Sequence, residues 1–170
     1  SAASDVYKRQ ELGRDAVSAS TRGSLRALGC DRGERWLTCL PLHHVAGLQT
    51  VLRTRELGGE PIVHDRFDPE LIAADTQASW ISLVPTQLAR LLDVGVDLTR
   101  FRGVLLGGAA PLPGLLERAE AAGATVVTSY GMTETCGPHT IDRMDVDLPA
   151  RLRGSFGRSV PGLEHKIVAV

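Results

Sequence analysis

Short apolar runs alternate with amphipathic segments along this chain, and this alternation restricts the fold more than any other feature of the sequence. It occurs about five times with short connections, as in sheets whose parallel strands are joined by covering helices. We therefore predict an α/β fold with a mostly parallel sheet flanked by helices. The expected strands are residues 35–40, 61–64, 80–84, 103–106 and 124–127; the expected helices are residues 11–30, a segment that follows residues 42–47 and ends at 57, and residues 69–76, 86–92 and 115–122.

The pattern has one clear helix start and weakens towards the carboxyl end. Asp68 is a good N-terminal cap, and Pro69 suits the first helical position. Residues 138–152 are polar and charged, which predicts an irregular surface excursion. Residues 154–162 predict a glycine-rich turn segment, and residues 165–170 predict a strand that stops with the chain.

The domain organisation follows from length and from the two ends. Residues 1–10 have no periodicity, so we exclude them from the fold as a non-structural tail or remnant. Residues 11–170 then form one domain, because a chain of 170 residues is long enough to bury a core. The final strand-like run ends abruptly, which indicates that the sequence is a piece of something larger.

Charge and cysteine content exclude several classes of protein. With 19 basic and 20 acidic residues the formal charge is −1, which disfavours a general binder of nucleic acid or anionic membranes and favours small-molecule partners. Cys30, Cys39 and Cys136 are odd in number and scattered, as expected of reduced thiols in a cytoplasmic protein rather than a disulfide framework or zinc site. No stretch is long and apolar enough to span a bilayer.

Four predicted loops follow strands and should meet at one edge of the sheet. They are residues 42–47, 84–87, 107–111 and 129–137. In an open α/β sheet the loops after parallel strands share the carboxyl edge, where such proteins bind ligands. The predicted loops therefore mark a candidate binding site.

The last of these loops carries the densest group of site-type residues. An aromatic ring such as Tyr130 can stack on a base, the Thr133 hydroxyl can hold a phosphate oxygen, and the Glu134 carboxylate can hold magnesium. The alternative is structural, since Thr133 followed by Glu134 can simply cap and start a helix. The neighbouring loops favour the nucleotide interpretation over the cap.

Four ordered motifs resemble the acyl-adenylate-forming superfamily, which contains acyl-CoA synthetases, adenylation domains and luciferases. The motifs are LPLHHVAG at 40–47, GGAAPL at 107–112, SYGMTET at 129–135 and the glycine-proline segment 154–162. One such motif would be weak evidence, but several in order are specific. Within the superfamily, residues 37–48 and 82–92 are most similar to the o-succinylbenzoate-CoA ligases of menaquinone synthesis, whereas residues 138–166 are more similar to general fatty-acid or aryl-acid CoA ligases.

The resemblance implies that the chain is part of the large N-terminal domain of an enzyme that activates a carboxylic acid with ATP and transfers the acyl group to coenzyme A. Glu134 would hold Mg²⁺, Thr133 would donate to the α-phosphate, and Tyr130 would stack on adenine. The other residues implied at the nucleotide are Gly107, Gly108, Ala109, Ser129, Gly131 and Met132.

The resemblance also implies the residues at the acyl end of the site. His44 would line the route of the coenzyme A thiol, and residues 84–86 (Val84, Pro85 and Thr86) would form the wall of the acyl pocket. Arg53 could pair with a second carboxylate on the acid. Two alternatives remain at the level of sequence: His44 as a satisfied core imidazole and Arg53 as a solvated helix arginine.

Several parts of the superfamily pattern have no match in this sequence. They are the phosphate loop with its lysine, the aspartate that holds the ribose, the hinge, and the small carboxyl-terminal domain with its catalytic lysine. We therefore expect the 170-residue chain to be inactive alone and to bind ATP weakly. A different function class also stays open, a non-catalytic nucleotide-binding remnant. A dinucleotide-binding oxidoreductase is disfavoured, since no glycine fingerprint follows the first strand.

Overall fold

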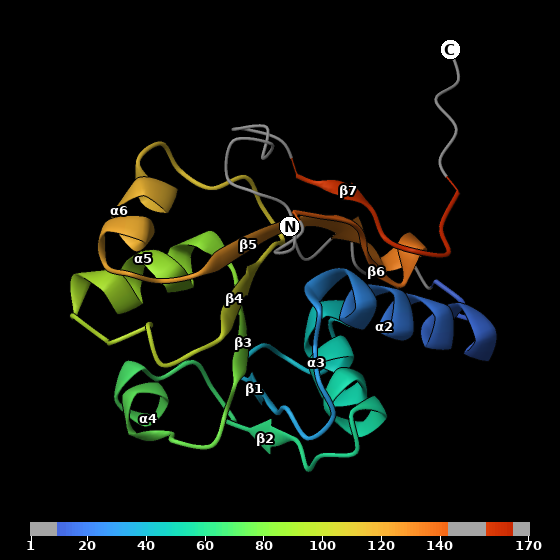
Figure 1. Ribbon diagram of the computed structural model, residues 1–170, viewed down its shortest axis with the longest axis horizontal. Helices are drawn as coiled ribbons and strands as arrows, with labels where there is room; N and C mark the ends of the chain where they lie inside the picture. The colour runs from blue at the N-terminus through green and yellow to red at the C-terminus, as the bar shows by residue number, and fades with distance from the viewer. Residues whose placement is uncertain (1–9, 143–155, 165–170) are drawn as a thin grey trace.

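A single mixed sheet, with strand order β2-β1-β3-β4-β5-β6-β7, runs through the protein (Figure 1). The computed structural model describes residues 10–142 and 156–164. Strands β1 to β5 pair in parallel, and β6 and β7 are added antiparallel, so the predicted mostly parallel α/β fold is confirmed. The strands are β1 Trp36–Thr38, β2 Ile62–Val63, β3 Trp80–Leu83, β4 Gly103–Leu106, β5 Val126–Met132, β6 Gly137–Ile141 and β7 Arg158–Ser159.

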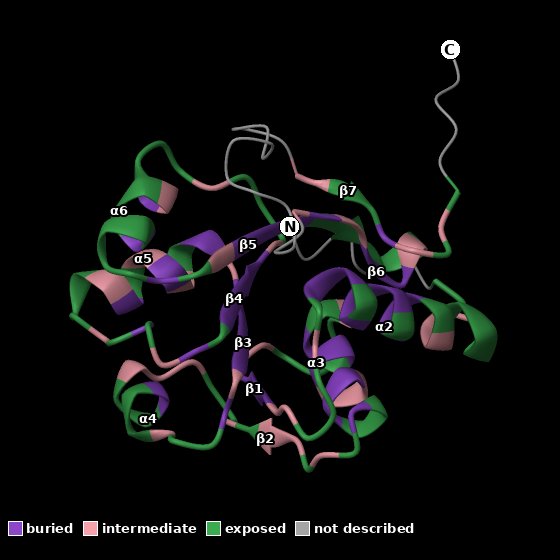
Figure 2. Ribbon diagram, in the orientation of Figure 1, coloured by how far each residue is buried: buried purple, intermediate pink, exposed green. Residues whose placement is uncertain are grey.

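Helices cover both faces of the sheet. On one side α2 and α3 pack together, and on the other side lie α4, α5 and α6 (Figure 1). Each side has its own core: Leu25, Leu28 and Val127 belong to one cluster, and Leu88 and Leu106 belong to the other. Figure 2 shows the buried central strands between these helix layers. The helices are α2 Arg14–Leu28, α3 Val45–Glu56, α4 Pro69–Ala74, α5 Pro85–Asp93 and α6 Leu115–Ala121, with a 3₁₀ helix, η1, at Thr133–Thr135.

The predicted start of α4 is confirmed in detail. Asp68 Oδ1 accepts hydrogen bonds from the backbone N–H groups of Glu70 and Leu71 at 3.1 and 3.4 Å, and Pro69 occupies the first turn. Helix α5 begins at Pro85, one residue earlier than expected, because proline supplies a helical φ without needing a hydrogen-bond partner. None of the helices in the described part of the chain is long and apolar enough to cross a membrane.

The prediction for residues 129–141 was wrong in secondary structure. Strand β5 continues through Met132 instead of ending at residue 127, and residues 137–141 form β6 rather than an irregular excursion. The physical reason is antiparallel pairing between β5 and β6, which a local pattern does not reveal. The remainder of the predicted excursion, residues 143–152, and the predicted strand 165–170 lie outside the described residues. Within the predicted glycine-rich turn, Arg158–Ser159 is a short strand.

Two stacked indoles pack at the amino ends of the central strands. The rings of Trp36 and Trp80 lie 5.1 Å apart at an interplanar angle of 15°, and both residues are fully buried. A Cβ atom added at Gly103 on β4 would lie 2.3 Å from Trp80 Cζ3. Glycine at this position is therefore required by the width of the Trp80 ring.

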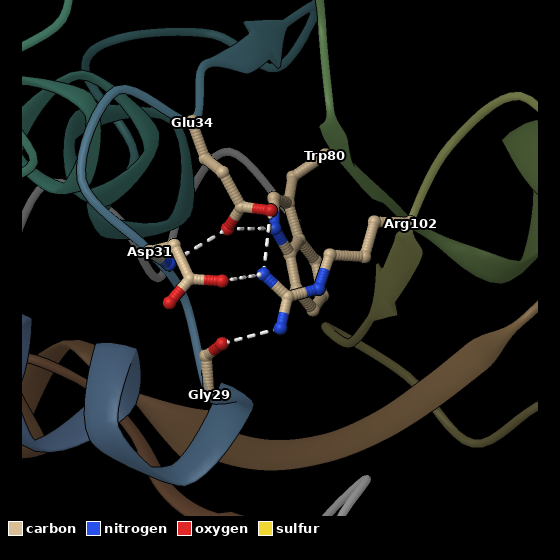
Figure 3. A network of polar contacts seen from close by, with 5 residues as sticks. All are labelled: Gly29, Asp31, Glu34, Trp80 and Arg102. Carbon is tan, nitrogen blue, oxygen red and sulfur yellow. Dashed lines mark hydrogen bonds and ion pairs between the residues drawn. The ribbon is translucent and has the colours of Figure 1, made fainter.

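A polar network on the outer side of this pair connects α2 to the sheet (Figure 3). The Arg102 guanidinium donates to Asp31 Oδ2, Glu34 Oε1 and Gly29 O at 2.8, 2.6 and 2.6 Å. Glu34 Oε2 also accepts from Trp80 Nε1 at 3.0 Å. These contacts hold the segment after α2 against the starts of β3 and β4.

The first test of this packing is Gly103→Ala. We expect it to lower the free energy of unfolding by about 2 kcal/mol, because the added methyl group overlaps the Trp80 ring and core overpacking typically costs that much. Chemical denaturation monitored by tryptophan fluorescence measures the change. Gly13→Ala is the control, since a Cβ there meets nothing within 4 Å and its expected cost is limited to a weaker N-cap of α2. Equal stability of the two variants would contradict the packing described.

Candidate active site

The structure brings three of the four predicted loops to the carboxyl edge of the parallel strands through direct contacts. Gly107 N–H donates to Leu83 O at 3.1 Å, at the ends of β4 and β3. Ser129 Oγ donates to Leu106 O at 3.1 Å. A Cβ atom on Gly108 would lie 3.2 Å from Val84 Cγ1, and Gly108 has a φ of 83°. The starts of the segments after β3 and β4 therefore lie beside Ser129.

Tyr130 presents its ring at this edge. The side chain is 47% exposed, and its ring meets that of His139 edge-on at 4.8 Å and that of Phe156 at 5.9 Å. His139 carries no local signal in the sequence, yet its ring packs against Tyr130. The signal that the sequence lacked was the β5–β6 pairing, which brings His139 back beside the tyrosine.

Thr133 and Glu134 lie in a tight 3₁₀ turn directly after β5, and both are exposed. Met132 N–H donates to Thr135 Oγ1 at 3.1 Å, and Cys136 N–H donates to Thr133 O at 2.9 Å. Thr133 is the first residue of this short 3₁₀ helix, and Met132 occupies the cap position. The structural alternative therefore holds only in part: Thr133 starts a helix of three residues but does not cap it. The turn thus places an exposed threonine and an exposed glutamate at consecutive positions.

His44 lies at the N-cap position of α3 and is exposed. Its backbone N–H donates to Pro41 O at 3.1 Å, and its ring lies 4.3 Å from that of His43. The interpretation as a buried core imidazole is therefore wrong. A Cβ atom on Gly47 would lie 2.4 Å from Pro41 O, so this glycine lets the first turn of α3 pack against the segment before it.

Arg53 lies apart from the other predicted residues. It is 1% exposed, its Nε donates to Ser24 Oγ at 3.0 Å, and its guanidinium lies 4.9 Å from the centroid of the Trp36 ring. Burial lowers its pKa to about 10. The interpretation of Arg53 as a solvated helix arginine is therefore wrong. The guanidinium packs beside Trp36 at the start of β1, whereas the candidate site lies at the carboxyl ends of the strands, so this position does not support direct contact with a second carboxylate of the acid.

The remaining predicted site residues differ in how far they are exposed. Thr86, Ala109 and Met132 are exposed at or near the edge, and Val84 is half-buried. Pro85 is buried and starts α5, and Ser129 is 8% exposed with its hydroxyl bound to backbone. Pro85 and Ser129 therefore shape the site more than they line it.

Gly131 is required by the closeness of β5 and β6. A Cβ atom there would lie 2.2 Å from Gly137 O and 2.6 Å from Pro138 Cα, at the point where the register of the two strands shifts. A β-bulge of this kind redirects the chain next to a functional site. The bulge sets the direction in which the following turn leaves the sheet.

The second test is Gly131→Ala. We expect a loss of about 2 kcal/mol or more in the free energy of unfolding, because both clashing atoms belong to the backbone and cannot move away. Gly107→Ala is the control, since a Cβ there meets mainly the Ser129 hydroxyl, at 2.9 Å, and a side chain can rotate. Thermal unfolding compares the two, and a milder effect at Gly131 than at Gly107 would contradict the assigned strand pairing.

Comparison with known sequences gives a consistent group of relatives. A sequence model of the family described as AMP-binding enzyme matches residues 12–170. A 2-succinylbenzoate–CoA ligase of Enterococcus faecalis is 35% identical over 156 residues, covering 88% of this chain and 32% of the relative. The corresponding protein of Lactococcus lactis is 30% identical, covering 98% of this chain and 37% of the relative. The chain thus spans about a third of the length of the curated relatives it matches.

Solved structures give the same result. The o-succinylbenzoate CoA synthetase of Bacillus subtilis in complex with the acyl-adenylate intermediate superposes with a TM-score of 0.79 at 30% identity, over 89% of this chain and 32% of that one. The same enzyme in complex with ATP and magnesium ion has a TM-score of 0.79 at 29% identity, with the same coverage. The MenE protein of E. coli with a bound analogue of OSB-AMS has a TM-score of 0.76 at 34% identity, over 90% of this chain and 33% of that one.

Proposed function

Because the chain belongs to the AMP-binding enzyme family, we propose that it carries the nucleotide and magnesium side of an AMP-forming acid–CoA ligase site. The observation that carries this proposal is the turn after β5, where Thr133 and Glu134 are exposed and directly follow the strand that carries the exposed Tyr130. In the reaction, a carboxylate attacks the α-phosphorus of ATP and releases pyrophosphate. The thiol of coenzyme A then takes the acyl group and releases AMP.

The base and the sugar-phosphate would be held by different parts of the edge. The exposed face of Tyr130 offers a stacking surface for adenine. Gly107 and Gly108 follow β4, where a Cβ atom would meet Ser129 Oγ at 2.9 Å and Val84 Cγ1 at 3.2 Å, and the positive φ of Gly108 is one that L side chains rarely adopt. We propose that a nucleotide base approaches the backbone of this turn, because the two glycines add no side chain there.

Thr133 and Glu134 suit the phosphates. The Thr133 hydroxyl can donate to an α-phosphate oxygen, and the Glu134 carboxylate is a ligand type that Mg²⁺ prefers. Bound magnesium neutralises charge on phosphate oxygens. The described residues contain no group of three or more metal-ligating side chains. A magnesium ion at Glu134 would therefore take its other ligands from phosphate and water, as is usual for this ion.

The acyl end is assigned to His44, Val84 and Thr86, with coenzyme A approaching from the side of His44. We propose o-succinylbenzoate as the acid, on the strength of the names of the relatives. A fatty or aryl acid is the alternative. The buried, unpaired thiols of Cys39 and Cys136 fit a reducing, cytoplasmic location for this function.

The function is tested in a chimera of the Bacillus subtilis synthetase, in which residues 12–170 of this chain replace the corresponding segment. The chimera should release pyrophosphate with o-succinylbenzoate in preference to benzoates and fatty acids. Glu134→Gln should lower the rate about 100-fold or more, because the turn then lacks its anionic metal ligand. Glu117→Gln, on the exposed face of α6, is the control and should leave the rate unchanged.

Three outcomes of this experiment contradict parts of the proposal. A folded chimera that fails to release pyrophosphate with any of the acids would contradict the ligase function and favour a non-catalytic nucleotide-binding remnant. A preference for long-chain acids would keep the ligase function and remove o-succinylbenzoate. A Glu134→Gln chimera as active as its parent would remove the assigned metal ligand.

A further inference from the structure

The carbonyl of Cys136, immediately after the Thr133–Thr135 turn, is held by two side chains from distant helices. Gln49 Nε2 on α3 donates to Cys136 O at 2.7 Å, and Ser20 Oγ on α2 donates to it at 3.0 Å. Gln49 and Ser20 are each 1% exposed. A single backbone oxygen that takes two buried donors is fixed in position, because a lost bond there leaves a desolvated polar group.

Gln49 is itself held in place. Its Oε1 lies 3.0 Å from Thr21 Oγ1, whose one hydroxyl proton is shared between Gln49 Oε1 and Val17 O at 2.9 Å, and Thr21 is buried on α2. With the oxygen directed to Thr21, the amide nitrogen is directed to Cys136. The contact is therefore one ordered chain of hydrogen bonds from α2 through α3 to the turn.

The backbone at the end of the turn needs such support. Among the described residues other than glycine, only Cys136 has a positive φ, of 62°, a conformation that is unfavourable for L side chains. The next residue, Gly137, has a φ of 125°, and a Cβ there would lie 3.3 Å from Gln49 Cγ and 3.4 Å from Ser20 Oγ. The reversal of the chain from η1 into β6 is thus formed against these two side chains.

Gln49 also shares a helix with His44. His44 is the N-cap residue of α3, and Gln49 is the fifth residue of the helix. Cys136 N–H donates to Thr133 O at 2.9 Å, so the fixed carbonyl and the exposed hydroxyl belong to the same small turn. One helix therefore carries His44 and fixes the position of the turn with Thr133 and Glu134.

We propose that Gln49 is a positioning residue, which acts through the Cys136 carbonyl to hold Thr133 and Glu134 in place for phosphate and magnesium. The proposal rests on the proposed function for its ligand, but the contact itself is independent of that function. Gln49 touches neither nucleotide nor metal. Loss of the Gln49 amide should weaken the binding of phosphate and magnesium by the turn and leave base stacking on Tyr130 unchanged.

The test uses Gln49→Met in the full 170-residue chain, because methionine keeps the length of the side chain and removes both polar groups. We expect the Cys136 amide to exchange hydrogen about tenfold faster than in the wild type, after correction for any change in global stability. A factor of about ten is the size expected for one lost hydrogen bond. We also expect the gain in ATP affinity on adding Mg²⁺ to fall about tenfold, with adenosine affinity unchanged. Nuclear magnetic resonance measures all three quantities.

Thr54→Val is the matched control, because it removes buried hydrogen bonds of the Thr54 hydroxyl on the same helix and lies towards the other end of α3. It should lower global stability without a selective effect at Cys136. Where Gln49→Met does not fold, Thr21→Val tests the same chain of bonds with a smaller change and should give the same selective pattern.

The proposal is overturned if folded Gln49→Met, or Thr21→Val in its place, keeps the wild-type exchange rate of the Cys136 amide. It is also overturned if the affinity for adenosine and the gain in ATP affinity on adding Mg²⁺ fall by the same factor, as expected of a purely structural variant. A wild-type chain that shows no magnesium gain at all removes the proposed function. In that case the exchange at Cys136 still decides whether Gln49 holds the turn.

Discussion

The antiparallel pairing of β5 with β6 is the constraint on which the candidate site depends. It extends β5 past the parallel part of the sheet, shifts register between Tyr130 and Gly131, and forces the chain to reverse within a few residues. The backbones approach so closely at Gly131 that a Cβ atom has no space there, and at Gly137 a Cβ atom would press on the side chains of Gln49 and Ser20. The turn with Thr133 and Glu134 is exposed because the strands on both sides of it are fixed.

The amino and carboxyl ends of the parallel strands differ in how they are stabilised. At the amino ends, the stacked Trp36 and Trp80 rings, the buried Arg53 and the Arg102 network hold α2 and α3 against the strands. At the carboxyl ends the side chains are more exposed, and the order comes from backbone contacts and from Gln49. A rigid amino end thus supports an open edge where a nucleotide can approach.

The sequence alone predicted the parts of the fold that depend on local patterns. The alternation of strands and helices, the cap at Asp68 and the meeting of the loops after β3, β4 and β5 follow from periodicity and from the geometry of parallel sheets. The β5–β6 pairing, the role of His139 and the contact of Gln49 with Cys136 could not be predicted, because each joins residues without a local signal. Arg53 shows the converse, since the sequence does not reveal that a charged side chain is buried against an indole.

The most direct measurement of the central claim is a titration of the isotope-labelled chain with ATP and Mg²⁺, followed by nuclear magnetic resonance. We expect the shifted amides to cluster at 107–109, at 130–136 and at the start of α3, with further shifts at 133–134 when magnesium is added to a sample that already contains ATP. The hollow between α4 and α5, lined by Arg66, Arg90 and Arg100, serves as an internal comparison. Shifts confined to that hollow, or none at the edge, would contradict the account.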